Sequence, residues 1–578
     1  MKTNLKWWTN SVINRRAWTW EDANNQQHNG HWWQHAVIYQ IYPLSFQDTT
    51  GDGVGDLNGI ISRMDYIASL GVDAIWLCPI FESPMEDMGY DITDMREIDP
   101  LFGTIEDFDR LIEIAHSFGI KVLIDGVWNH TSDKHPWFIE SRKSRDNSRA
   151  DWYVWADAKE DGSPPNNWIS AFMGKSAWKW DEVRQQYYFC NFLPSQPELD
   201  WHNPEVVEEI VRQAEFWLER GIDGFRIDAV NFFIHDKHLR DNPVRPKNGV
   251  FPEGVDPDNP MVEHMFQYNF CRPESLDALK PLRQLCDRYP NTVTLGEVTL
   301  CEDSIALSGE YVAGKDRLNL AYNSALLTDE PMSAKLIKKT MARVQKHFPE
   351  GGQCWMVGNH DYGRLKSRWT GLATDGQPYP DCFYYAIAAL LLSLPGAFCL
   401  YQGDELGLTE GKIPKDIPED KIRDPFGKAL YPVVPGRDGS RTPMPWSSHK
   451  RNAGFTDGVE PWLPIPKKHY SEAVDKQNAD PHSLLNTWRK LMHWRKQQPA
   501  LIAGDFKALD TEEPILAFIR EYAEQNLLCV FNLSNESVSY QLPKQREYFP
   551  ETSLGFNFEL QQNIVKLPCY GVFFANLG

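Results

Sequence analysis

The chain contains eight short runs of β-branched and other apolar residues, each followed by polar, acidic or glycine residues. The runs occupy residues 36–42, 73–79, 121–130, 223–231, 292–298, 317–323, 353–361 and 396–405. Helical patterns separate most of them; the one at residues 204–221 has proline in its first turn and glycine at its end. Eight strands that alternate with helices predict an α/β fold, a parallel (β/α)8 or TIM barrel.

Three stretches depart from this alternation. Residues 131–200 separate the third strand from its helix, are rich in Trp, Asn, Ser and Pro, and predict a small excursion domain. Residues 404–461 form a long insertion after the eighth strand. Residues 499–578 alternate in segments such as ILAFIREY and LLCVFNLS, which predicts an antiparallel β-sandwich domain. Four domains are predicted. They are an N-terminal extension (residues 1–31), the barrel (32–130 and 201–498), the excursion (131–200) and the C-terminal domain (499–578).

Residues 383–401 are apolar enough to suggest a transmembrane helix. Pro395 and Gly396 interrupt the segment, and they leave too few helical residues to cross a bilayer. A buried helix, a turn and a buried strand are predicted instead.

Charge and cysteine usage narrow the function classes. The 578 residues include 59 basic and 80 acidic side chains, a net charge of −21, which argues against nucleic acid and anionic membranes as partners. The ten cysteines are scattered without CxxC pairs, as in reduced proteins. The N-terminal residues lack the apolar region of a secretory signal, so a cytoplasmic protein is expected.

The fourth predicted strand carries the first candidate for chemistry. Its alternation turns Gly224, Arg226 and Asp228 toward the barrel axis. A neighbouring cation lowers the pKa of a carboxylate, so Asp228 is expected to be ionised, as a nucleophile must be. The alternative is a structural ion pair that closes the barrel.

Polar groups also end the neighbouring strands. Glu297 lies between apolar residues, and burial would raise its pKa, so that it could donate a proton at neutral pH. Because catalytic groups of such barrels gather at the carboxyl ends of the strands, the acids are expected to converge there. An ionised Asp, a protonated Glu and a third acid suit glycosidic bond cleavage. Further candidates at the strand ends are Asp87, Tyr90, Asp91, Asp125, Asn129, His130, Asn359, His360 and Asp361.

The motifs in this order resemble the α-amylase superfamily, glycoside hydrolase family 13, in its α-glucosidase and oligo-1,6-glucosidase branch. The motifs extend from about residue 32 to residue 447 and read WWQHAVIYQIYPLSF, GDGVGDLNGI, GYDITD, DGVWNHTS, QPELDWHNPEV, GFRIDAVN, GEV, GNHD and GRDGSRTPMPW. The resemblance implies Asp228 as nucleophile, Glu297 as general acid/base and Asp361 as transition-state stabiliser. It also implies substrate-binding roles for Asp91, His130, Arg226, His360 and Arg437, with Arg423 as a weaker candidate.

The implied activity is that of a retaining, exo-acting α-glucosidase, which would release terminal glucose from short α-glucosides through a covalent glucosyl-enzyme. Ala229 after the nucleophile favours α-1,4 linkages by the same resemblance. Leu44, Gly126 and Trp128 depart from the family pattern near the pocket. Small α-glucosides are the expected partners, and the chain is expected to act as a monomer or homodimer.

The segment DTTGDGVGD spaces its oxygen atoms like the first nine positions of an EF-hand loop. The ligands would be Asp48, Thr50, Asp52, the carbonyl of Val54, and Asp56. Relatives hold Ca²⁺ or Mg²⁺ in this loop, so a structural metal is expected, and no organic cofactor. The alternative is a turn in which the Asp side chains bind nearby N–H groups.

Three other functions stay open. A transglucosidase or isomerase acting on sucrose, trehalose or maltose would use the same covalent intermediate. Some relatives are non-catalytic partners of amino-acid transporters, but those carry a membrane anchor and lack catalytic acids. A metal-dependent barrel hydrolase would need ligand pairs such as HxH or HExxH, which the sequence does not contain.

Overall fold

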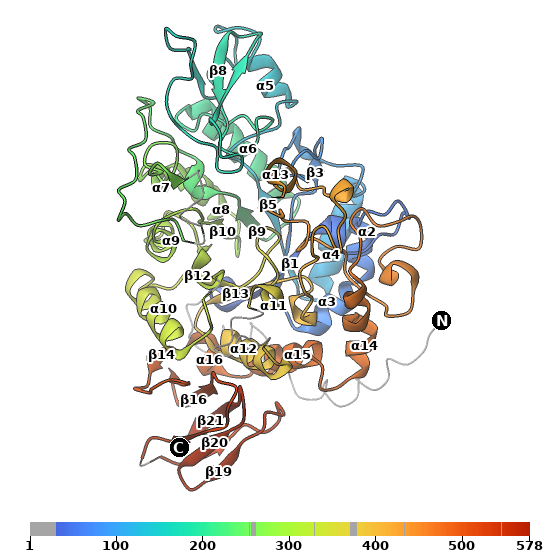
Figure 1. The fold of residues 1–578 in the computed structure, drawn as a ribbon, viewed down its shortest axis with the longest axis vertical. Helices are drawn as coiled ribbons and strands as arrows, with labels where there is room; N and C mark the ends of the chain where they lie inside the picture. The colour runs from blue at the N-terminus through green and yellow to red at the C-terminus, as the bar shows by residue number, and fades with distance from the viewer. Residues whose placement is uncertain are drawn as a thin grey trace.

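The computed structural model describes residues 31–253, 255, 262–328, 330–369, 379–432, 434–544 and 546–578. The predicted N-terminal extension therefore lies almost wholly outside the described residues. Figure 1 shows a central barrel with the excursion at one end and the C-terminal β domain at the other.

Eight parallel strands close the barrel in the order β1-β13-β12-β11-β10-β9-β5-β2, so the predicted fold class is confirmed. Each strand falls within one of the eight predicted runs. The register aligns the third and fourth strands with Asp125 opposite Arg226, which brings their polar ends together. The strands are β1 (Val37–Ile41), β2 (Ala74–Leu77), β5 (Lys121–Gly126), β9 (Gly224–Ile227), β10 (Val293–Glu297), β11 (Leu320–Tyr322), β12 (Gln353–Met356) and β13 (Ala397–Tyr401).

Helices that bury one apolar face surround the strands. In α4, Phe108, Leu111 and Ala115 are buried, and Thr104 caps the helix with a reciprocal bond to Asp107. The barrel helices are α2 (Leu57–Ser62), α3 (Met64–Leu70), α4 (Ile105–Ser117), α6 (Pro204–Glu219), α7 (Ser275–Ala278), α8 (Lys280–Cys286), α9 (Ser304–Val312), α10 (Ala334–His347), α12 (Asp381–Ser393) and α15 (Leu484–Arg495).

The apolar segment at residues 383–401 forms α12, a turn and β13, as predicted. Gly396 in the turn has φ 102°, a conformation that glycine adopts without strain. Within the described ranges of the chain, no helix has the length and apolar character needed to cross a membrane.

Two additional groups of strands lie outside the barrel. The excursion contains α5 (Pro136–Ser141) and a three-stranded antiparallel sheet of β6 (Trp155–Ala156), β8 (Gln186–Phe189) and β7 (Trp178–Asp181). Two short elements, β3 (Phe81–Glu82) and β4 (Asp94–Ile98), pair beside the loop that follows β2.

The C-terminal domain follows α16 (Pro499–Ala503) and contains two antiparallel sheets. Buried residues from both sheets, including Ile519, Val530, Val565 and Phe573, pack in one cluster, as the predicted sandwich requires. The strands are β14 (Asp505–Ala508), β15 (Ile515–Tyr522), β16 (Gln525–Asn532), β21 (Val572–Leu577) and β18 (Tyr548–Pro550) in one sheet, with β17 (Val538–Gln541), β20 (Ile564–Leu567) and β19 (Glu559–Gln561) in the other.

Candidate active site

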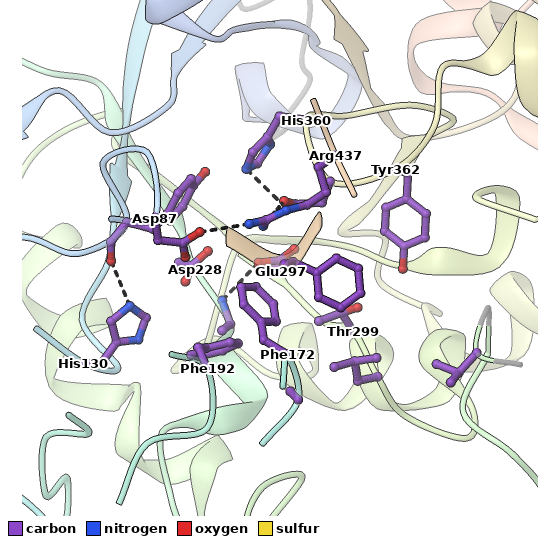
Figure 2. A pocket seen from close by; sticks show the side chains of 17 residues that line it. Asp87, His130, Phe172, Phe192, Asp228, Glu297, Thr299, His360, Tyr362 and Arg437 are labelled. Atoms are coloured by element: carbon purple, nitrogen blue, oxygen red, sulfur yellow. Dashed lines mark hydrogen bonds and ion pairs between the residues drawn. The ribbon is translucent and has the colours of Figure 1, made fainter. Parts of the chain in front are cut away.

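A cavity of about 300 Å³ opens at the carboxyl ends of the barrel strands. Figure 2 shows that its walls come from several barrel loops, with aromatic rings opposite the acids. The described lining residues are Asp87, Tyr90, His130, Ala171, Phe172, Phe192, Asp228, Ala229, Val255, Glu297, Thr299, Leu300, His360, Asp361, Tyr362, Phe426 and Arg437. The three predicted acids therefore share one cavity.

Arg226 forms the floor beneath two of these acids. Its Nη1 lies 2.7 Å from Oδ1 of Asp125 and 2.7 Å from Oδ1 of Asp228. Its Nη2 lies 2.5 Å from Oε2 of Glu297, and the guanidinium also contacts the hydroxyl of Tyr322. A guanidinium presents its donors in a rigid planar fork. Asp228 and Glu297 are thus held side by side across a single group.

The pKa values of Asp228 and Glu297 are both raised. Burial raises the pKa of Glu297 to about 7, with Arg226 opposing and the charges of Asp228 and Asp361 adding. This confirms the direction expected from the sequence. Burial also raises the pKa of Asp228, to about 6, because Arg226 only partly offsets it and Asp125 adds to it. Arg226 lowers the pKa of Asp228, as expected from the sequence, but burial outweighs it and the net shift is upward. The group is still mostly ionised at pH 7.

Asp361 lies in a different electrostatic setting. Its Oδ1 accepts hydrogen bonds from Nη1 of Arg437 (2.9 Å) and Nη2 of Arg441 (3.0 Å). Its Oδ2 lies 3.2 Å from Nε2 of His360. Burial raises the pKa of Asp361, but His360 and the two arginines outweigh it and hold the pKa well below its usual range. Asp361 is accordingly a permanent anion.

Arg437 connects loops from three parts of the chain. It contacts Asp361 after β12, Asp87 after β2 (2.9 Å) and Asp424 in the insertion after β13 (2.8 Å). Its guanidinium also lies over the ring of Phe172 from the excursion, 4.9 Å from the ring centroid. These contacts close one side of the cavity.

The two predicted histidines line the cavity in neutral form. Burial lowers the pKa of His130 to about 4 and that of His360 to about 3. His130 Nε2 lies 2.9 Å from the carbonyl of Tyr90, and the ring of Tyr90 stacks on His360 at 5.2 Å. Neutral imidazoles in these positions can exchange hydrogen bonds with sugar hydroxyls.

Three predicted substrate contacts do not line this cavity. The Asp91 carboxylate accepts from Ser83 and from the N–H groups of Glu86 and Asp87, so it shapes the loop that presents Asp87. Arg226 is fully buried below the acids and acts through them. Arg423 borders a neighbouring cavity with Lys428 and Glu86.

Several lining residues were not among the predicted sites. Phe172 and Phe192 come from the excursion and Phe426 from the insertion, segments with no period that would assign them to a face. Thr299 and Tyr362 lie two and one residues beyond predicted acids, so their position near the strand ends was the available signal. Arg441 belongs to the GRDGSRTPMPW motif but was not singled out.

The predicted metal loop is held by its own hydrogen bonds. Both carboxylate oxygens of Asp48 accept backbone N–H groups, at Thr50, Gly51 and Gly53. Asp56 caps α2 through the N–H of Gly59. Within the described ranges, the carboxylates of Asp48, Asp52 and Asp56 do not gather as a close set. As arranged, the loop fits the turn interpretation better than an ion cage, and the metal stays a prediction.

One other group of possible metal ligands occurs among the described residues. Ligand atoms of Asp200, His202 and His235 lie within 4.8 Å of one another. His202 Nε2 already bonds the carbonyl of His235, at 2.8 Å. None of the three lines the cavity that holds the acids.

Family models match nearly the whole described barrel and the β domain. The α-amylase catalytic domain model matches residues 40–504, and the maltogenic amylase C-terminal domain model matches residues 506–573. The chain belongs to the α-amylase family. It is therefore an enzyme of the glycoside hydrolase class, as predicted.

Individual relatives extend over the same length. A probable alpha-glucosidase of Rhizobium meliloti is 45% identical over 550 residues, which cover 95% of this chain and 97% of the relative. An oligo-1,6-glucosidase of Parageobacillus thermoglucosidasius is 35% identical, with 92% and 95% covered. The solved alpha-glucosyl transfer enzyme XgtA has a TM-score of 0.89 and 47% identity, with 95% of this chain and all of that chain (100%) covered.

Proposed function

We propose that this chain is a retaining, exo-acting α-glucosidase for short α-glucosides, with glucosyl transfer to other hydroxyls as a side reaction. The observation that carries the proposal is the single guanidinium of Arg226 that holds Asp228 and Glu297 together. Carboxyl groups that are close together suit double displacement, because no room is left for a water molecule between sugar and carboxylate.

In the first step, an oxygen of Asp228 attacks the anomeric carbon while the glycosidic C–O bond breaks. Glu297 donates its proton to the departing oxygen, which its raised pKa allows at neutral pH. Asp361 stays charged and stabilises the oxocarbenium-like transition state. The product of this step is a glucosyl ester of Asp228.

In the second step, Glu297 has become a base and takes a proton from water or from a sugar hydroxyl. The activated oxygen attacks the anomeric carbon and frees Asp228. Two displacements on the same carbon restore the α configuration. Hydrolysis and transfer differ only in the acceptor that enters.

The cavity supports exo action on short substrates. Its volume of about 300 Å³ is small for a ligand site and suits a short saccharide better than a long chain. Arg437 closes one side by joining Asp87, Asp361 and Asp424. A terminal glucose would therefore meet a closed end, with the rest of the substrate toward the phenylalanine rings.

A transglucosidase is the second candidate, favoured by the solved alpha-glucosyl transfer enzyme at 47% identity. Phe172, Phe192 and Phe426 line the same cavity and would favour a sugar or aryl acceptor over water. The decisive experiment is chromatography of products from maltose, isomaltose, sucrose, trehalose, maltotriose and an aryl α-glucoside. Glucose release, fastest from α-1,4 substrates, supports the proposal; new disaccharides as the main products support the second candidate.

The remaining expectations are proposals with separate tests. A divalent ion in the loop at residues 48–56 would raise the melting temperature in Ca²⁺ or Mg²⁺ relative to a chelator, and Asp52→Ala would remove that difference. No difference in melting temperature would favour the turn interpretation.

The oligomeric state and the cellular location have their own tests. Light scattering of the purified protein distinguishes monomer from homodimer, and fractionation of the source cells tests the cytoplasmic location.

A further inference from the structure

Two cysteines that are far apart in the sequence meet where the barrel contacts the C-terminal domain. Sγ of Cys382 lies 3.3 Å from Sγ of Cys569, across 187 residues of sequence. A disulfide bond has an S–S length of about 2.05 Å, so the sulfur atoms need to approach by about 1.3 Å. We propose that Cys382 and Cys569 form a reversible disulfide that fastens the C-terminal domain to the barrel.

Rigid neighbours hold both cysteines in place. Cys382 is the second residue of α12. Cys569 lies in the tight turn between β20 and β21, where the N–H of Gly571 bonds the carbonyl of Pro568 at 3.0 Å. Tyr570, the next residue, packs edge-on against Phe383 at 5.2 Å. Packed elements therefore place the two cysteines on opposite sides of the contact between the domains.

Because α12 lies between the barrel and the C-terminal domain, a disulfide at Cys382 would join the two domains. Figure 1 shows α12 on the part of the barrel nearest the C-terminal sheets, and α12 packs against β16. At the other end of α12, Arg520 of the β domain donates a 2.6 Å hydrogen bond to the carbonyl of Ser393. A disulfide at Cys382 would add a covalent tie at the opposite end of the helix.

Solvent exposure distinguishes this cysteine pair from a second pair of cysteines that lie close together. Cys382 and Cys569 are both partly exposed, so a small oxidant can reach them. Cys354 and Cys399 are 3.7 Å apart on β12 and β13, but each is only 1% exposed. The barrel shields that pair, which makes it an internal control.

The oxidant is a low-molecular-weight disulfide such as glutathione disulfide. The thiolate of Cys569 attacks one sulfur, forms a mixed disulfide and releases one glutathione thiolate. Cys382 then loses its proton and attacks the Cys569 sulfur, which forms the protein disulfide and releases the second glutathione. Two protein thiols are oxidised, and one glutathione disulfide is reduced to two thiols. Burial and the neighbouring Cys569 raise the pKa of Cys382 to about 12, so Cys382 is a poor candidate for the first attack.

To test the proposal, the full-length enzyme is treated with glutathione disulfide, and its free thiols are counted after denaturation. The count should fall from ten to eight, and non-reducing peptide mapping should join the peptides of Cys382 and Cys569. The melting temperature should rise by about 2–4 °C, because a cross-link over a long loop restrains the unfolded chain. Dithiothreitol should reverse both effects.

Two variants make the test specific. Cys382→Ser should stop at the first step, with one glutathione on Cys569 and no rise in melting temperature. Cys354→Ala should still form the Cys382–Cys569 link. An unchanged thiol count in the wild type, a link between other cysteines, or a link without a rise in melting temperature would overturn the proposal. Activity plays no part in these readouts, so their failure leaves the proposed glycosidase function untouched.

Discussion

The candidate active site has two halves that differ in how cations are distributed among carboxylates. On one side, Arg226 is shared by Asp125, Asp228 and Glu297. On the other, Asp361 has two arginines within 3.0 Å: Arg441, and Arg437, which also pairs with Asp87 and Asp424. All three catalytic candidates border the same cavity. They differ in the number of arginines that contact each carboxylate: one for Asp228 and Glu297, and two for Asp361.

The number of arginines decides which acids can carry a proton. One cation cannot offset the burial of three carboxylates, so the pKa values of Asp228 and Glu297 rise to about 6 and about 7. Two arginines and His360 outweigh the burial of Asp361, and its pKa falls. In the proposed mechanism the first half exchanges a proton with the substrate, whereas the second half supplies a negative charge.

The largest effect is expected from Asp228→Asn, which removes the nucleophile from the shared half. Turnover of an aryl α-glucoside should fall about 10⁴-fold with an unchanged circular dichroism spectrum and melting curve. Asp361→Asn is the matched variant in the other half, and it should also lose turnover. Only Asp228→Asn should abolish labelling by a mechanism-based glucosyl fluoride. Near-normal turnover of Asp228→Asn would refute its role.

The second effect concerns the proton on Glu297. Glu297→Gln should lower kcat/KM, which reports the first displacement, about 10³-fold for maltose, whose leaving group needs protonation, and much less for a nitrophenyl α-glucoside. The ratio of the two rates measures the acid role. Equal losses on both substrates would contradict it.

Arg226→Lys tests the shared cation itself. A lysine cannot hold Asp228 and Glu297 in one fork, so kcat/KM should fall about 10²-fold. Because less positive charge reaches Glu297, its pKa should rise, and the alkaline limb of the pH profile should move to higher pH. A lower kcat/KM with an unchanged pH profile would indicate that Arg226 forms only a structural ion pair.

Arg437→Lys is the matched change in the other half. Asp361 would keep Arg441 and stay ionised, so the pH profile should not move. The closed end of the cavity would loosen, and KM should rise about tenfold with a smaller change in kcat. A shifted profile here would show that the two halves are not electrostatically separate.

The smallest change is made by pH alone. The proposed mechanism requires Asp228 ionised and Glu297 protonated, so kcat/KM should decline below about pH 6 and above about pH 7. Each limb should change about tenfold per pH unit and report the pair rather than either residue. Rates measured from pH 4 to pH 9 in one mixed buffer provide the profile. A further limb assigned to Asp361 would contradict its low pKa.

The barrel could be predicted from the sequence because each strand is an apolar run that ends in polar residues. Asp228, Glu297 and Asp361 follow such runs, and topology alone brings them together. Asp87 and Asp91 show the limit: they share one loop, and only the hydrogen bonds of Asp91 to Ser83, Glu86 and Asp87 decide which carboxylate reaches the cavity.

The net rise of the Asp228 pKa could not be predicted from the sequence for a related reason. Arg226 is visible two residues away, whereas Asp125 lies about a hundred residues upstream and the burial of the site is a tertiary property. The phenylalanines of the excursion and the insertion likewise lie in segments without periodicity. Long-range packing, which no local pattern encodes, supplied each of these features.

In the proposed function, Asp228 and Glu297, held by one arginine, cleave the glycosidic bond by two displacements. Time-resolved ¹H NMR of nitrophenyl α-glucoside hydrolysis tests it directly, because the anomeric signal of the first product precedes mutarotation. With two displacements, α-glucose should appear first and the β anomer later. Initial release of β-glucose would contradict it.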